Sequence, residues 1–176
     1  INTNFIDNDG ATLLFVRKFE DDSEVGSTIA AIARTLTIIT NCEFRNNLGD
    51  YYSSYVIQVF YSDILLIYDT SFISNKVDNI IVKKSVINID NCTFKYNHGL
   101  AMHLTYCIGN IFNSVFNNNT CIEAAALKLW STIIYIHGSE FKKNEGGAIE
   151  CFVKSSITFR DICILRSEEH TSELQS

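Results

Sequence analysis

The stretch NIDNCTFKYN, from Asn88 to Asn97, decides how this chain folds, because variants of it return along nearly the whole sequence. Each copy has apolar residues, then an Asn, Asp or Gly, a small residue, an aromatic, and an Asn three residues after the aromatic. The other full copies are IITNCEFRNN (Ile38 to Asn47), LIYDTSFISN (Leu66 to Asn75), NIFNSVFNNN (Asn110 to Asn119) and YIHGSEFKKN (Tyr135 to Asn144). A clipped copy opens the chain at Asn2, and a degenerate one ends it at Ile164.

The aromatic anchors allow the copies to be aligned as columns. After Phe44, successive anchors are 22 to 28 residues apart, a period that is typical of a stacked repeat. Three columns are apolar, and we expect all three to face a core. Twelve residues before the anchor they hold Ile32, Phe60, Val82, Leu104, Leu129 and Phe152. Eight before it they hold Leu36, Ile64, Val86, Ile108, Ile133 and Ser156, and five before it Ile39, Ile67, Ile89, Ile111, Ile136 and Phe159.

Between the apolar columns lie polar ones, which we interpret as corners. They stand nine and three residues before the anchor and three after it. Asn, Asp and Gly tolerate the left-handed backbone that a sharp bend requires. Three apolar stretches separated by three corners describe one triangular turn of a solenoid. The stretches are short and rich in β-branched and aromatic residues, which favours strands.

Stacked strands lie about 4.8 Å apart, so equivalent residues of successive turns lie directly above one another. The sequence therefore predicts an all-β parallel β-helix of about six to seven coils. Its interior should hold a stack of rings, and one corner should hold a ladder of hydrogen-bonded amides. These two structural ladders comprise Phe44, Phe72, Phe94, Phe116 and Phe141, and Asn47, Asn75, Asn97, Asn119 and Asn144.

The segment FKKNEGGAI, from Phe141 to Ile149, resembles the paired FxxN and GGAI motifs of chlamydial polymorphic outer membrane protein repeats. FxxN holds in six copies, whereas GGAI is intact in one and has weak echoes in HGLAM (His98 to Met102) and EAAAL (Glu123 to Leu127). More broadly, the chain resembles right-handed parallel β-helices of the pectin-lyase-like class. The resemblance implies a right-handed coil, an extracellular or cell-surface location (the outer membrane in a bacterium) and a role in adhesion.

A leucine-rich repeat is the alternative fold, since CEFRNN (Cys42 to Asn47) also fits the LxLxxN core of that family. It would need an apolar residue two positions after the Asn, where this chain has Gly49, Val77, Gly99, Cys121 and Gly146. It would also need a helical or extended convex segment where the sequence shows β-like runs at 80–82 and 127–129.

The last eleven residues, RSEEHTSELQS (Arg166 to Ser176), do not continue the repeat and are similar to the frame-one translation of a widely used sequencing adapter. We therefore expect residues 1–165 to be one β-helix segment of a longer solenoid and residues 166–176 to be a non-native tail.

Without the one Arg and three Glu of the tail, 13 basic and 17 acidic residues leave a net charge of about −4. No Lys and Arg cluster, which argues against nucleic-acid binding. No apolar run approaches the ~18 residues of a membrane helix, so the segment itself is not expected to span a membrane.

The cysteines and acidic residues are the candidates for a disulfide, metal or catalytic site. The six cysteines form no CxxC pair, and Cys42 and Cys92 share a column with Thr70, Ser114 and Ser139, so we expect small buried residues. Enzymes on this fold use carboxylates from neighbouring coils. Here only Asp69 and Asp90 come from successive coils, and they are offset by one position, while Asp69 and Asp161, like Glu43 and Glu140, are four coils apart. The acidic loop Phe19 to Gly26 lacks calcium-ligand spacing. The sequence thus predicts no catalytic residue, metal site or cofactor.

Among the histidines, His98, His103 and His137 fall in three different columns, but His103 and Lys128 share an outward column in successive coils. They define a small polar patch, or simply a solvated face. We expect a non-enzymatic scaffold segment of a larger secreted or surface protein, which contacts a protein or glycan surface ligand. A carbohydrate-active enzyme, a polysaccharide lyase or hydrolase with its catalytic coils elsewhere, is the main alternative, and a structural stalk is a third.

Overall fold

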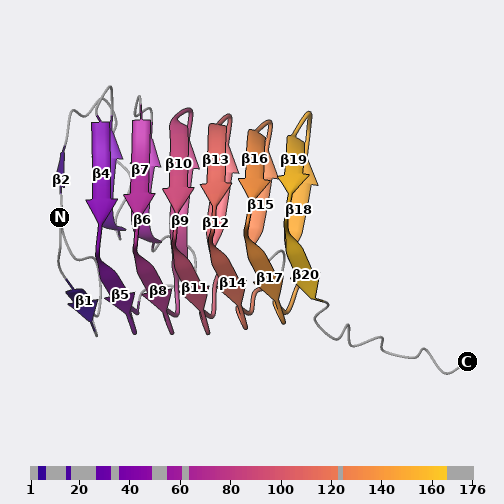
Figure 1. Ribbon diagram of the computed structural model, residues 1–176. Coiled ribbons are helices and arrows are strands. Elements are labelled where there is room, and N and C mark those ends of the chain that lie inside the picture. Colours follow the sequence, from indigo (N-terminus) through magenta and orange to yellow (C-terminus); the bar gives the residue numbers. More distant parts are fainter. Residues whose placement is uncertain are drawn as a thin grey trace, which may run out of the picture.

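A computed structural model describes residues 4–6, 15–16, 27–32, 36–48, 55–60, 64–122 and 125–165. Every regular element in these ranges is a β-strand, and within them no helix is long and apolar enough to cross a membrane. The strands form three sheets, whose members stand side by side in Figure 1 from the N-terminal to the C-terminal end of the stack. The expected all-β fold is confirmed. The proposed tail, residues 166–176, and the acidic loop Phe19 to Gly26 lie outside the described residues.

The three sheets are named here by number. Sheet 1 contains β1 (Asn4–Ile6), β5 (Glu43–Arg45), β8 (Ser71–Ile73), β11 (Thr93–Lys95), β14 (Val115–Asn117), β17 (Glu140–Lys142) and β20 (Cys163–Leu165). Sheet 2 contains β4 (Leu36–Thr40), β7 (Ile64–Tyr68), β10 (Val86–Asp90), β13 (Ile108–Phe112), β16 (Ile133–His137) and β19 (Ser156–Arg160). Sheet 3 contains β2 (Phe15–Val16), β3 (Ser27–Ile32), β6 (Tyr55–Phe60), β9 (Asp78–Lys83), β12 (Met102–Thr105), β15 (Leu127–Trp130) and β18 (Ile149–Phe152).

The chain visits the sheets in rotation, and each strand pairs in parallel with its equivalent one turn later. Residue Phe94, for example, lies between Phe72 and Phe116 in sheet 1. The strands from β3 to β20 make six coils, each with one strand in every sheet, in line with the six to seven coils expected. The leucine-rich repeat is wrong, because the runs at 80–82 and 127–129 belong to strands β9 and β15 of a third parallel sheet.

Two of the predicted core columns behave as expected. The five Phe anchors from Phe44 to Phe141 have no exposed surface. The column five residues before the anchor is also buried from Ile39 to Ile136, and it becomes exposed only at Phe159 in the last coil. The interior is therefore a continuous apolar column that runs along the stack.

The column eight residues before the anchor was expected in the core, and this is wrong. Leu36, Ile64, Val86, Ile108 and Ile133 all lie on the outside of sheet 2. Side chains alternate between the two faces of a strand. The columns eight and five residues before the anchor differ by three positions within one strand, so they cannot both point inward. The inward position is one residue further on, where Leu65, Ile87 and Ile134 are buried.

The prediction that the column twelve residues before the anchor faces the core is confirmed for its middle members and wrong for those at its ends. Val82, Leu104 and Leu129 are buried, but Phe60 pairs with Lys83 and Phe152 pairs with Trp130. A slip of one residue moves a strand side chain to the opposite face. In the last coil the corner contains an extra residue, and Val153 and Lys154 both have positive φ. Ile32 pairs with Phe60 and shares its register.

The corners also differ from the expectation in one respect. Three residues before the anchor, the small polar residues do adopt the left-handed backbone, with φ of 51° at Asn41 and 52° at Asn91. At the other two corners the left-handed residue comes one position earlier, as at Lys84 (φ 52°) and Tyr96 (φ 57°). The small polar residue that follows is buried and forms hydrogen bonds instead, as the next section describes.

Candidate interaction site

The predicted Phe ladder lies in the core beneath sheet 1. Ring centroids of successive Phe residues are 4.9, 4.7, 4.8 and 4.7 Å apart from Phe44 to Phe141, and the ring planes differ by at most 8°. This spacing equals the distance between strands, because each ring occupies the same position in its coil. The stack fixes the rigid frame from which outward side chains project.

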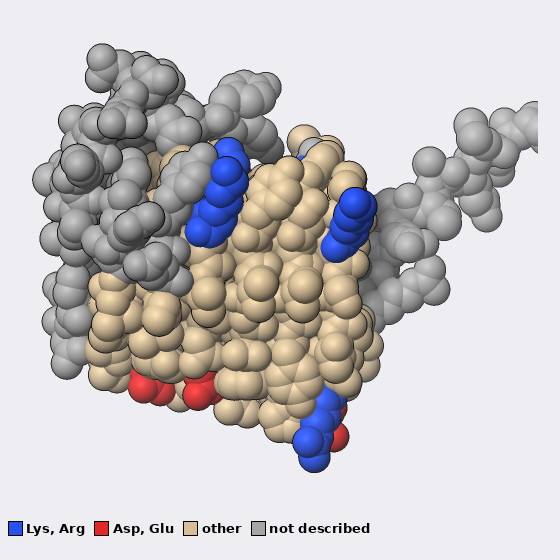
Figure 2. Space-filling view, turned by 90° about the horizontal axis from the view of Figure 1, so that it is seen from above, with Lys and Arg blue, Asp and Glu red and all other residues tan. Residues whose placement is uncertain are grey.

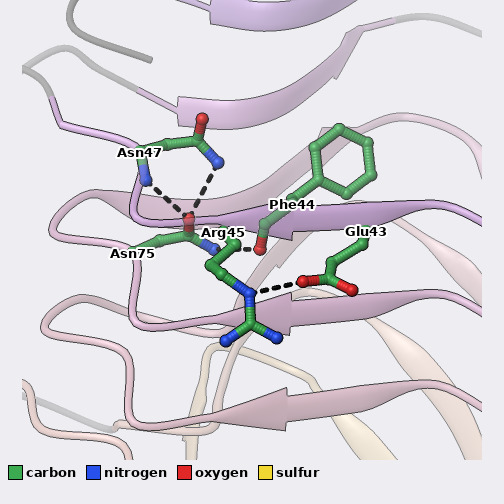
Figure 3. A network of polar contacts seen from close by, with 5 residues as sticks. All are labelled: Glu43, Phe44, Arg45, Asn47 and Asn75. Carbon is green, nitrogen blue, oxygen red and sulfur yellow. Dashed lines mark hydrogen bonds and ion pairs between the residues drawn. The ribbon is translucent and has the colours of Figure 1, made fainter. Parts of the chain in front are cut away.

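The predicted Asn ladder lies at the corner that follows sheet 1. In Figure 3, the main-chain N–H and the Nδ2 of Asn47 both donate to Oδ1 of Asn75, at 3.0 and 2.8 Å. Asn97 and Asn119 repeat the amide contact at 2.9 Å. Nδ2 of Asn75 instead reaches Oδ1 of Asn79 at 2.8 Å, so the amide ladder branches at this coil. These buried amides satisfy main-chain groups at a bend where the strand ladder is interrupted.

The inner cysteines are part of the same frame. Cys42, Cys92 and Cys107 are buried, and burial raises the pKa of Cys92 to about 12. The main-chain N–H of Cys92 donates to the Ser114 hydroxyl at 3.1 Å. A thiol with so high a pKa is a poor nucleophile, so Cys92 acts as a small buried side chain.

The two aspartates from successive coils, Asp69 and Asp90, each bind the amide side chain of a different Asn. Asp69 accepts a hydrogen bond from Asn91 Nδ2 at 2.6 Å, and Asp90 accepts one from Asn113 Nδ2 at 2.9 Å. On sheet 1, Glu43 and Glu140 each pair with a basic residue two positions along their own strand, and the Lys142–Glu140 pair is 2.7 Å long. Within the described ranges, no three His, Cys, Asp or Glu side chains are placed to share a metal ion.

The histidines are separated, as their columns indicated. His98 is exposed and its backbone pairs with Thr120. His137 lies on sheet 2, 3.4 Å from a carboxylate oxygen of Asp161. His103 lies on the outward face of sheet 3, directly beside Lys128 in the next coil. The structure therefore places His103 and Lys128 together as the sequence predicted.

The structure adds a third titratable residue to this column. Lys128 pairs with Glu150 in the following coil, so His103, Lys128 and Glu150 form a row across β12, β15 and β18. One carboxylate oxygen of Glu150, Oε2, is buried and has no hydrogen-bond partner among the described residues. A buried carboxylate oxygen without a donor is unfavourable.

An aromatic pair lies next to this row. Trp130 and Phe152 follow two residues after Lys128 and Glu150, and their rings stack at 5.4 Å with 22° between the planes. Trp130 is 38% exposed, and Lys128 Nζ lies 5.5 Å from the centre of the Phe152 ring. The outward face therefore combines a donor, a carboxylate and a flat apolar surface.

Burial and charge tune the titratable groups around the row. Burial lowers the pKa of His103, and the positive charges of Lys128 and Lys83 lower it further. The His103 ring nitrogen Nε2 is 3.3 Å from the Thr105 hydroxyl. Burial raises the pKa of Asp78, and the main-chain N–H of Leu100, which donates to its Oδ1 at 2.7 Å, opposes that rise. Burial likewise raises the pKa of the Cys121 thiol, and the charge of Asp78 adds to this effect.

Sequence reasoning missed Glu150, Trp130 and Phe152 as members of this site. Counting back from the anchor places Cys151, not Glu150, in the column of His103 and Lys128. The additional corner residue at Val153 and Lys154 shifts the last coil by one position. The GGAI motif ends at Ile149, immediately before Glu150, and aligning the last coil on that motif instead of on Ile164 was the signal that could have corrected the register.

The pKa of His103 offers a direct check of this geometry. We expect its NMR titration midpoint to lie below the ordinary value of about 6.5, and we expect Lys128→Met to raise it only in part, because burial is the larger cause. The folded state binds this proton less readily than the unfolded state. His103 therefore makes the free energy of unfolding decrease as the pH falls through about 6.5 towards the lowered pKa. Lys95→Met on sheet 1 is the control, and an equal shift in that variant would contradict the assignment.

No known family model matches the chain, and a search of the curated proteins finds no match.

Proposed function

We propose that this chain is a segment of a right-handed parallel β-helix, of the FxxN type found in polymorphic outer membrane protein repeats, within a larger secreted or cell-surface protein. Its role is that of a non-enzymatic interaction scaffold that binds a glycan. The observation that carries the proposal is the outward face of sheet 3, where polar residues from three successive coils, His103, Lys128 and Glu150, lie beside a stacked aromatic pair.

The chemistry of this face fits a sugar. A pyranose ring presents an apolar face, which packs on an exposed indole such as Trp130, and a rim of hydroxyl groups. Those hydroxyls can donate to the Glu150 carboxylate and accept from Lys128. A lowered His103 pKa keeps that ring neutral near pH 7, so it can accept or donate a hydrogen bond.

The rigid frame supports a binding role rather than a change of shape. The Phe stack and the Asn ladder are buried from Phe44 to Asn144, and the spacing of the outward residues follows from this frame. A ligand that spans several coils would meet side chains about 4.8 Å apart along the rod. Such a preorganised surface reduces the entropy lost on binding.

A fluorescence titration tests this proposal, because Trp130 is the only tryptophan of the chain. Neutral and acidic oligosaccharides of defined length are added while Trp130 emission is followed. We expect a saturable change, with affinity reduced about 10- to 100-fold by Lys128→Met or Glu150→Gln, since hydrogen bonds to charged groups are worth about 1.5–3 kcal/mol. Lys95→Met, a matched change on the outward face of sheet 1, should leave the affinity unaltered.

Two outcomes would contradict the proposal. The absence of a saturable signal with the whole panel would remove the glycan as ligand and favour a protein partner. In a second experiment, the same oligosaccharides are incubated with the protein and then analysed for shortened products. Cleavage that is lost in Glu150→Gln would replace the scaffold with the alternative of a carbohydrate-active enzyme.

A further inference from the structure

Two segments of the chain match the Asn-x-Ser/Thr pattern of N-glycan acceptors, and they lie in different surroundings. They are Asn91-Cys92-Thr93 and Asn118-Asn119-Thr120. In this pattern the sugar is attached to the Asn side chain, and the transfer also requires the hydroxyl two residues later. A three-residue pattern arises readily by chance in a chain rich in Asn. The position of each Asn in the fold therefore decides which of the two segments fits a glycan.

Asn91 lies on the outside of the corner between β10 and β11. Its backbone is left-handed, with φ of 52°, and its side chain is exposed. The next residue, Cys92, is buried, so the chain turns inward only after Asn91. A sugar on Asn91 thus projects into solvent and meets no part of the core.

The hydrogen bond of the Asn91 side chain is compatible with this attachment. Asn91 Nδ2 donates to Oδ1 of Asp69 in the preceding coil at 2.6 Å. A carboxamide nitrogen has two hydrogens, so it keeps one for Asp69 when the other is replaced by a sugar. Attachment therefore leaves the polar contact between the two coils in place.

Asn118 lies at the corner that follows sheet 1, and its surroundings are tighter. The residue is half-buried. The equivalent positions of the neighbouring coils hold Tyr96 and Lys143, which have the same left-handed backbone. The Thr120 hydroxyl of this segment donates to Glu145 Oε2 at 3.4 Å. A sugar on Asn118 would have to displace larger side chains on both sides, whereas one on Asn91 would not.

The corner of Asn91 is also remote from the candidate site. Three sheets surround one core, and the chain visits them in the order 3, 2, 1. The corner between sheets 2 and 1 therefore lies opposite sheet 3. A glycan on Asn91 leaves the row of His103, Lys128 and Glu150 uncovered.

The sheet that ends at this corner presents an apolar surface to water. Its outward face carries an exposed aliphatic column, which consists of Leu36, Ile64, Val86, Ile108 and Ile133. Figure 2, which looks down on the stack from above, also shows a broad area without charged side chains. Exposed apolar patches favour aggregation, and an N-linked glycan is a bulky, solubilising group. A glycan on Asn91 would place hydrated sugar at the edge of this sheet.

We propose that Asn91 is an N-glycan acceptor when this chain passes through a eukaryotic secretory pathway. Its Nδ2 forms a bond to C1 of the first sugar while the bond from C1 to a lipid-linked diphosphate breaks. The diphosphate leaves, and one Nδ2 proton passes to a base of the transferase. The proposal rests on the secreted location in the proposed function and is independent of the ligand of sheet 3.

Mass spectrometry of the full chain, secreted from eukaryotic cells behind a cleavable signal peptide, tests this proposal. Enzymatic release of an N-glycan converts the acceptor Asn into Asp and so identifies the modified residue. We expect the glycan at Asn91 and a lower occupancy at Asn118. Transfer precedes folding, and chains modified at a half-buried position fold less well, so they are depleted among the secreted molecules.

Substitutions in the Asn91 segment separate the pattern from accidental modification. Thr93→Ala should abolish the glycan although Asn91 is unchanged, and Thr93→Ser should retain it, because the hydroxyl is restored. Asn91→Gln removes the acceptor itself and should also be unmodified. Asn118→Gln is the matched control and should leave the modification of Asn91 unaltered. Circular dichroism verifies that each variant is folded.

Three results would overturn the proposal. They are a secreted, folded chain without a glycan at Asn91, a higher occupancy at Asn118 than at Asn91, and a modification of Asn91 that persists in Thr93→Ala. The fluorescence titration of sheet 3 is measured on the same secreted chain. Loss of sugar binding there would contradict the proposed function and leave the assignment of Asn91 intact, because the two measurements depend on different residues.

Discussion

Replacing Phe94 with alanine is expected to lower the free energy of unfolding by about 3–5 kcal/mol. The ring has no exposed surface, and its centroid lies 4.7 Å from that of Phe72 and 4.8 Å from that of Phe116. The neighbouring rings cannot close the gap, because the hydrogen bonds of sheet 1 hold their strands at a fixed distance. The lost contacts and the remaining cavity therefore both contribute to the cost.

Equilibrium unfolding in urea measures this effect, and the m value should stay unchanged if only stability is altered. Phe159→Ala is the matched control, because Phe159 lies in an interior column but is 44% exposed in the last coil. We expect less than half the loss for this variant. Equal losses at the two positions would show that the rings do not stabilise the stack through burial.

Replacing Asn97 with alanine is expected to cost about 2–3 kcal/mol, the second largest effect among these variants. Asn97 Oδ1 accepts the main-chain N–H of Asn75 at 2.9 Å, and Asn97 Nδ2 donates to the Phe72 carbonyl at 3.0 Å and to Asn119 Oδ1 at 2.9 Å. The substitution removes all three contacts in a region that water does not reach. The N–H of Asn75 then loses its acceptor while it stays buried.

The same unfolding experiment measures this variant alongside Asn110→Ala. Asn110 projects from the outward face of β13, and its loss should change stability by no more than about 0.5 kcal/mol. Asn97→Asp should cost at least as much as Asn97→Ala, since it places a buried carboxylate oxygen against the Phe72 carbonyl and Asn119 Oδ1, which are both acceptors. A neutral Asn97→Ala would refute a stabilising role for the amide ladder.

The three outward faces of the stack differ in the side chains that they present. Sheet 1 covers the Phe ladder and carries ion pairs along its own strands. Sheet 3 presents the row from His103 to Glu150 and the aromatic pair, and sheet 2 presents the aliphatic column. One repeat thus generates three different surfaces, because the three strands of each coil vary independently in their outward residues while their inward residues share one core.

The sequence by itself determined the stacked fold. The recurring aromatic and the Asn three residues after it identify the same point in each coil, so the rings and the amides had to align once the strands stacked in parallel. It also placed His103 beside Lys128. The stretch from His103 to its anchor Phe116 has the same length as the stretch from Lys128 to its anchor Phe141, so the two residues share one register.

Only the tertiary structure decided which residues face outward. Strand side chains alternate with a period of two, so one extra residue in a corner reverses the face of every residue in the adjoining strand. That reversal brought Glu150 and Phe152 to the site. Apolar residues also occupy both faces of sheet 2, and composition alone cannot separate an exposed Ile108 from a buried Ile111. Their orientation follows from long-range strand pairing and corner length, which the sequence spacing of a single coil does not contain.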